Sequence, residues 1–140
     1  YQRKAGLSQL VEAASVEDAK KVLATAVTPY WETHYTFGST SVRNDKNLSP
    51  FSLNLLCINT VVPILFAYGR HRGEEKYCDR AFDFLEQLRP ENNYIIRLWQ
   101  QSGLVVDNAG DSQALIQLKK EYCDKKECLR CRFGYEYLKL

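Results

Sequence analysis

Apolar residues recur along most of the chain at the three- and four-residue spacing of amphipathic helices. The first run follows Ser15, a capping residue with a carboxylate three positions later at Asp18. It continues to Thr28, where Pro29 disfavours a further helical turn. Its apolar face comprises Val16, Ala19, Val22, Leu23, Ala26 and Val27. The pattern predicts a helix from about residue 16 to residue 28.

The most apolar stretch, from Leu53 to Tyr68, predicts a central helix. Ser49 supplies a capping hydroxyl, and Pro50 suits the first helical position. Pro63 removes one helical hydrogen bond, so we expect a kink there. The apolar run is interrupted by Asn54, Asn59, Thr60 and Pro63. Because a membrane span needs about 20 mostly apolar residues, this pattern favours a buried core helix and no membrane partner.

The rest of the chain continues the helical pattern. Further helices are predicted over residues 74–88, from Asn92 or Asn93 to Gly103, from Asn108 or Asp111 to Tyr122, and from near Cys128 to Leu138. The polar segment 38–48 is predicted to be a loop, and the stretch 104–106 is too short to imply a sheet. The fold class is therefore all-α: a single compact orthogonal domain of six or seven helices spanning residues 1–140.

Composition narrows the function. With 140 residues, 45% hydrophobic and 26% charged, the chain suits one globular domain. A net charge of +2 excludes DNA binding driven by overall charge. The chain starts at Tyr1 and contains no Met, so we expect a fragment of a longer polypeptide. An odd count of five cysteines favours reduced thiols and a cytoplasmic location.

Signature motifs of common enzymes do not occur in the sequence. It contains no G-x-x-x-x-G-K-[ST], G-x-G-x-x-G, G-x-S-x-G or H-E-x-x-H pattern. Its two histidines are too few for a His-rich metal centre. The sequence therefore predicts no activity for this chain by itself.

The sharpest chemical pattern is Cys123-x4-Cys128-x2-Cys131. Thiolates bind Zn²⁺ and iron–sulfur clusters well, and Cys128 and Cys131 would share a helical face. A fourth ligand is needed, either Cys78, the first choice, or one of Cys57, His34, His71 and a residue outside this chain. The alternative is a helical hairpin with small buried thiols. Cys128-x-x-Cys131 is also a redox motif, but its helical context weighs against redox catalysis.

Two further groups are candidate surface or ligand sites. Trp31 and His34 lie in an aromatic segment whose rings could stack on nucleic-acid bases. The simpler interpretation is that these aromatic residues close the core and that His34 is a hydrogen-bonded structural histidine. Arg70, His71 and Arg72 form a basic helix end, which is either solvated or able to contact phosphate.

Three segments together resemble an uncharacterised bacterial family, domain-of-unknown-function family 2851. They are Tyr30-Trp31-Glu32-Thr33-His34-Tyr35-x-Phe37, the stretch from Ile58 to Gly69, and the stretch from Asp111 through Cys123, Cys128 and Cys131. The segments follow the order of the family and span nearly the whole chain. The resemblance implies that this chain is the C-terminal third of a longer protein.

The resemblance also implies context for function. The upstream part of the family carries an Asp and Glu pattern similar to restriction-type nuclease folds, and none of those residues is present here. We therefore expect a helical accessory or interaction domain of a larger cytoplasmic protein. Its partner would be the upstream domain, with nucleic acid contacted through that domain. The alternative is the cysteine-bearing part of a nuclease-like enzyme whose catalytic domain lies upstream and supplies the missing fourth ligand.

Overall fold

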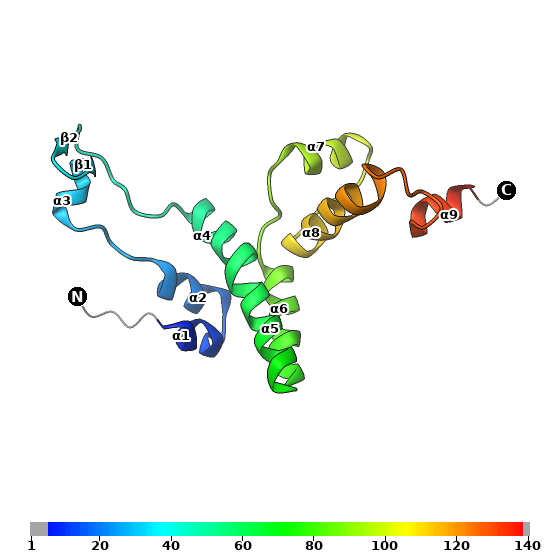
Figure 1. Cartoon of the computed structure of the whole chain (residues 1–140), viewed down its shortest axis with the longest axis horizontal. Coiled ribbons are helices and arrows are strands. Elements are labelled where there is room, and N and C mark those ends of the chain that lie inside the picture. The colour runs from blue at the N-terminus through cyan, green and yellow to red at the C-terminus, as the bar shows by residue number, and fades with distance from the viewer. Residues whose placement is uncertain (1–5, 139–140) are drawn as a thin grey trace. The chain divides into compact units, whose positions relative to one another are not determined.

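The computed structural model of the chain describes residues 6–138 (Figure 1). Helices dominate these residues and strand is confined to one short hairpin, so the all-α prediction is confirmed. The chain divides into two compact units, Tyr1–Phe84 and Leu85–Leu140. The single-domain organisation stays a prediction, and each unit is described by itself.

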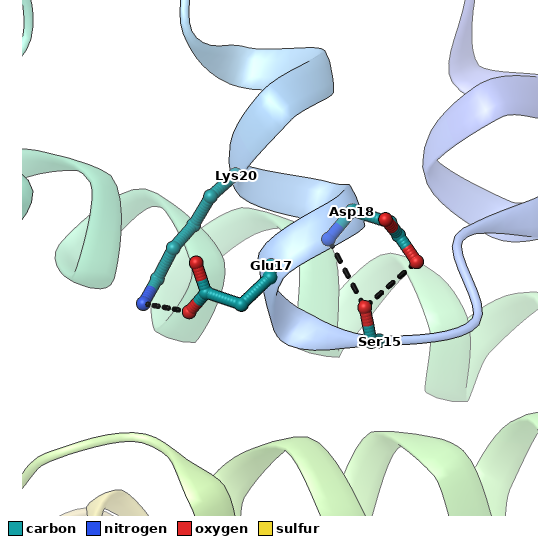
Figure 2. Close-up of polar contacts among 4 residues, drawn as sticks. All are labelled: Ser15, Glu17, Asp18 and Lys20. Atoms are coloured by element: carbon teal, nitrogen blue, oxygen red, sulfur yellow. Dashed lines mark hydrogen bonds and ion pairs between the residues drawn. The ribbon is translucent and has the colours of Figure 1, made fainter.

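The first unit begins with two short helices, α1 (Leu7–Glu12) and α2 (Val16–Leu23). The Ser15 hydroxyl oxygen accepts the backbone N–H of Asp18 at 3.1 Å and donates to its carboxylate at 2.7 Å (Figure 2). The predicted cap of α2 is thus present. The hydrogen bond from the Ser15 hydroxyl lowers the pKa of the Asp18 carboxyl, and Lys21 lowers that pKa to a smaller extent. Lys20 and Glu17 pair at 3.0 Å on the same helix.

The end of α2 differs from the prediction. The helix stops at Leu23, and the backbone N–H of Ala24 closes the last turn on the Lys20 carbonyl at 2.7 Å. Ala24 has an extended conformation, so Ala26 and Val27 do not continue the apolar face. The backbone N–H of Val27 instead donates to Asn47 Oδ1 at 3.1 Å, which ties this segment to the predicted loop.

The aromatic segment that follows is more ordered than expected. It forms a short helix α3 (Pro29–Glu32) and a hairpin of β1 (His34–Thr36) and β2 (Ser39–Thr40). The strands are antiparallel, with His34 opposite Thr40 and Thr36 opposite Ser39. Gly38 makes the turn with a φ of 78°, a conformation that glycine adopts without strain. The predicted loop 38–48 therefore begins with a strand.

The central helix runs without a break through α4 (Pro50–Leu56), the π-helical turn η1 (Cys57–Val61) and α5 (Val62–Arg72) (Figure 1). Ser49 caps its start and accepts the backbone N–H of Ser52 at 3.1 Å, as predicted. A π-helical turn, η1, ends two residues before Pro63, and the kink predicted at Pro63 stays a prediction. A wider π turn accommodates a residue whose ring and missing N–H disrupt regular helical bonding.

Burial of this helix is much lower than predicted. Pro50–Arg72 is long and apolar enough to cross a membrane by length and composition, with a mean hydropathy of 1.7 in its most apolar window. Only 28% of that window is buried. Its buried residues are Cys57, Ile58, Val61, Val62, Leu65 and Gly69. The expectation of a buried core helix is therefore correct for one side of it only.

Helix α6 (Glu75–Gln87) packs against α5, and its residues up to Phe84 belong to the first unit. Gly69 permits the close approach, because a Cβ there would lie 2.8 Å from the Cys78 Sγ and 3.0 Å from the Cys78 backbone nitrogen. Gly73 ends α5 with a φ of 68°. Arg80 Nη1 donates to the carbonyls of Val11 and Ala13 at 3.1 and 3.2 Å, which joins α6 to the end of α1.

The second unit contains α7 (Tyr94–Gln101), α8 (Ala109–Leu118), the π-helical turn η2 (Lys119–Cys123) and α9 (Arg132–Leu138). Asn93 and Asn108 are the N-caps of α7 and α8, each one of two predicted choices. Its core contains Ile96, Val106 and Leu115. Fully buried Ser112 accepts the backbone N–H of Glu91 at 3.2 Å and donates to the Ala109 carbonyl at 2.9 Å.

Candidate functional site

The segment between α8 and α9 carries the three C-terminal cysteines. Cys123 is the last residue of η2, which continues α8, so it ends the helix before the cysteine turn as predicted. Lys126 then adopts a left-handed backbone with a φ of 56°. The N–H of Glu127 donates to the Tyr122 carbonyl at 2.9 Å, and the N–H of Lys126 donates to the Cys123 carbonyl at 3.1 Å. This pair of bonds is a Schellman motif, which stops the helix and turns the chain.

Cys128 and Cys131 lie in the following turn, not on a helix. The N–H of Cys131 donates to the Cys128 carbonyl at 3.2 Å and to the Glu127 carbonyl at 3.1 Å. The predicted start of the last helix near Cys128 is wrong, because α9 begins at Arg132. Gly134 of α9 lies directly against this turn, since a Cβ at Gly134 would be 2.3 Å from the Cys128 carbonyl oxygen.

All three cysteines line one apolar cavity of about 430 Å³ within the second unit. Its other lining residues are Trp99, Leu104, Leu115, Leu118, Tyr122, Phe133 and Gly134. Trp99 is held in place by its Nε1–H, which donates to the Leu115 carbonyl at 3.2 Å. The volume lies in the range of small-molecule pockets, and the thiols, the Tyr122 hydroxyl and the Trp99 N–H are the polar side-chain groups among these residues.

The thiols differ in exposure and chemistry. Cys123 and Cys128 are exposed, whereas Cys131 is buried. Partial burial raises the pKa of the Cys123 thiol, and the neighbouring Cys131 and Cys128 raise it further. Lys119 opposes this rise. Cys123 is therefore less ionised near neutral pH than an ordinary cysteine.

The cavity does not form a ready metal site. Across residues 6–138, no group of three or more His, Cys, Asp and Glu side chains is arranged to hold a metal ion. Cys78, the first choice for a fourth ligand, belongs to the first unit, where its Sγ lies 3.6 Å from the Phe66 carbonyl oxygen and is buried against Gly69. Cys57 is also buried, and burial raises the pKa of its thiol. A Zn²⁺ or iron–sulfur site at the three cysteines stays a prediction.

The aromatic segment brings Trp31 and His34 together around Tyr30. The His34 ring stacks on the Tyr30 ring at a centroid distance of 3.9 Å, and Trp31 meets Tyr30 edge-on at 5.0 Å. His34 Nδ1 lies 2.8 Å from the Tyr30 carbonyl oxygen and 3.1 Å from the Thr33 hydroxyl oxygen. These contacts agree with the interpretation of a hydrogen-bonded histidine, and a ligand site at Trp31 and His34 stays a prediction.

The basic helix end is the exposed last turn of α5. Arg72 Nε pairs with Glu74 at 3.4 Å. Arg70 lines a separate hollow of about 430 Å³ in the first unit. The other lining residues are Phe66, Gly69, Gly73, Glu75, Cys78, Asp79 and Phe82. Sequence reasoning placed Arg70 among the candidate residues but missed Phe66 and Phe82.

The left-handed Lys126 gives a test of how the cysteine segment is held. Lys126→Gly is expected to stabilise the second unit by about 1 kcal/mol, because glycine adopts a positive φ without the steric cost of a Cβ. Urea unfolding followed by circular dichroism would measure the change. Lys125→Gly, one residue earlier, is the matched control and should not stabilise. A lower stability of Lys126→Gly would contradict this account of the turn.

Comparison with known proteins identifies a family. The family described as "Protein of unknown function (DUF2851)" matches residues 1–94. No curated protein and no solved structure matches the chain. The matched residues include the aromatic segment and the central helix, and they end before the three cysteines. Because the match covers more than half of the sequence, the chain belongs to the DUF2851 family.

Proposed function

We propose that this chain is a helical interaction module, without activity of its own, that binds protein through the hollow around Phe66 and Phe82. The proposed partner is the upstream part of its own polypeptide, which the family resemblance implies. The proposed location is the cytoplasm, in keeping with the odd count of five cysteines.

One observation carries this proposal. The Phe66 and Phe82 side chains are 40% and 56% exposed, although they lie on neighbouring helices and touch each other. Their rings meet edge to face, with centroids 5.8 Å apart and an interplanar angle of 80°. Adjacent exposed aromatic side chains form the kind of apolar patch that marks protein interaction surfaces.

The surroundings of the two rings suit a protein partner. The hollow that they line also contains Arg70, Glu75 and Asp79. Aromatic residues and arginine are enriched at the centre of protein interfaces, and charged side chains around them favour the correct partner. The surface continues along a helix whose apolar window is only 28% buried.

Hydrogen exchange would test the proposal in the full-length polypeptide. Amides of residues 62–84 are expected to exchange at least about tenfold more slowly in the full-length polypeptide than in this chain alone, because a bound partner suppresses local opening. Phe82→Ala should remove that extra protection. It should cost this chain alone no more than about 1.5 kcal/mol of unfolding free energy, the upper range for an aromatic pair.

Phe51→Ala is the matched control, since Phe51 is also 56% exposed and does not line the hollow. It should leave the protection of residues 62–84 unchanged. Equal exchange in the two contexts would contradict the proposal. Protection that arises only with lipid vesicles would point to a membrane surface instead.

The alternative of a nuclease-like enzyme rests on the family resemblance. It would be supported if the full-length polypeptide cleaved DNA or RNA with Mg²⁺ while this chain alone did not. Cleavage by this chain alone would contradict the proposal that it has no activity of its own.

A further inference from the structure

The turn that carries Cys128 and Cys131 has the backbone of a site for a short disulfide. The Cys131 N–H donates to the Cys128 carbonyl at 3.2 Å, which closes a β-turn. Such a turn holds its first and last Cα atoms within about 7 Å, and disulfides join Cα atoms about 4.4–6.8 Å apart. Both cysteines line the same cavity, so their side chains face a common space.

The two thiols also differ in the way that a stepwise exchange requires. Cys128 is exposed and can meet a reagent in solution, whereas Cys131 is buried beside it. An accessible thiol reacts first, and a protected neighbour then resolves the mixed disulfide.

We propose that Cys128 and Cys131 form a reversible disulfide by exchange with a low-molecular-weight disulfide, a modification site that goes beyond the proposed interaction surface. The Cys128 thiolate attacks one sulfur of the small disulfide, forms a mixed disulfide and releases one small thiolate. The Cys131 thiolate then attacks the Cys128 sulfur and releases the second. The two cysteine protons end on the released thiolates. The protein dithiol is oxidised by two electrons, and the small disulfide is reduced to two thiols.

Cys123 is the third thiol of the cavity and remains reduced in this proposal. Its raised pKa leaves less thiolate for attack. Because Cys131 and Cys128 lie near enough to raise that pKa, a link to Cys123 is the competing product that peptide mapping must exclude. The disulfide closes only the short loop from Cys128 to Cys131, so it constrains the unfolded chain little.

The experiment uses oxidised glutathione as the small disulfide. The protein is equilibrated with glutathione mixtures of increasing oxidation, quenched with acid, unfolded and labelled with N-ethylmaleimide. Intact mass should show three labelled cysteines of the five, and peptide mapping should find the Cys128–Cys131 link. Cys123→Ser should keep the link, and both Cys128→Ser and Cys131→Ser should lose it. Cys131→Ser should instead accumulate glutathione on Cys128.

A second measurement separates the folded site from mere closeness in sequence. The equilibrium constant for disulfide formation should be at least about tenfold larger in the folded protein than in concentrated urea. This ratio corresponds to a reduction potential about 30 mV more negative for the disulfide in the folded protein. Equal equilibrium constants in the folded and the urea-unfolded protein would overturn the proposal, because the folded turn would then not favour disulfide formation. Five labelled cysteines after oxidation, a link to Cys123, or products joined between two protein molecules would also overturn it.

Discussion

Phe84→Ala is expected to lower the free energy of unfolding of the first unit by about 3–5 kcal/mol. The Phe84 side chain is only 1% exposed and is among the largest fully buried side chains in residues 6–138. Removing its ring deletes the buried apolar surface and leaves a cavity that the surrounding helices fill only in part. Urea unfolding followed by circular dichroism would measure the loss.

Phe82→Ala provides the matched control two residues away on the same helix. Phe82 is 56% exposed, so its removal should cost no more than about 1.5 kcal/mol, mainly from the edge contact with Phe66. Similar losses for the two variants would contradict the burial pattern of α6. The same pair of variants separates folding from binding, because Phe82→Ala should affect the proposed interface while Phe84→Ala affects the core.

Gly69→Ala is expected to destabilise the first unit by about 1–3 kcal/mol, the usual cost of overpacking. On an exposed helix the same change would stabilise by about 1 kcal/mol, since alanine is the better helix former. Here the new Cβ would lie 2.8 Å from the Cys78 Sγ and 3.0 Å from both the Cys78 backbone nitrogen and the Glu74 carbonyl oxygen. The backbone atoms cannot move aside without separating α5 from α6.

A double-mutant cycle with Cys78→Ala would locate the clash. Removing the Cys78 sulfur relieves one of the three close contacts, so Gly69→Ala should cost less in the Cys78→Ala background but should still destabilise. A stabilising effect of Gly69→Ala in the wild-type background would show that the two helices do not pack at this distance.

Phe84→Ala and Gly69→Ala concern the unit that the DUF2851 match covers in full, since that match extends from residue 1 to residue 94. The matched residues include the proposed interface at Phe66 and Phe82, whereas the cysteine cavity lies beyond them. The interface and the cysteines are therefore separate hypotheses, and each has its own test.

Helix caps show what the sequence alone could determine. Ser15, Ser49, Asn93 and Asn108 each accept a backbone N–H three residues ahead, in agreement with the sequence analysis. A cap bond of this kind joins groups within one helical turn, so the residues that decide it are adjacent in the sequence. The all-α class followed from the same local pattern, repeated along the chain.

The less regular features were not predictable in this way. Helix α2 ends five residues before the Thr28 expected to end it. Helix α9 begins only at Arg132, because Cys128 and Cys131 lie in a turn that follows the left-handed Lys126. The hairpin after α3 was missed, because its strands are too short for a period-two pattern to stand out.

Burial and the two candidate surfaces were decided by tertiary structure. The sequence showed that the stretch from Leu53 to Tyr68 is apolar, but only the packing of α1, α2 and α6 determined which side of the central helix is covered. Likewise, the spacing of the cysteines suggested a cluster, but the cavity also needs Trp99 of α7, Leu115 of α8 and Phe133 of α9. A helical hydrogen bond depends on residues a few positions apart, whereas a cavity or an exposed face depends on side chains brought together from distant parts of the chain.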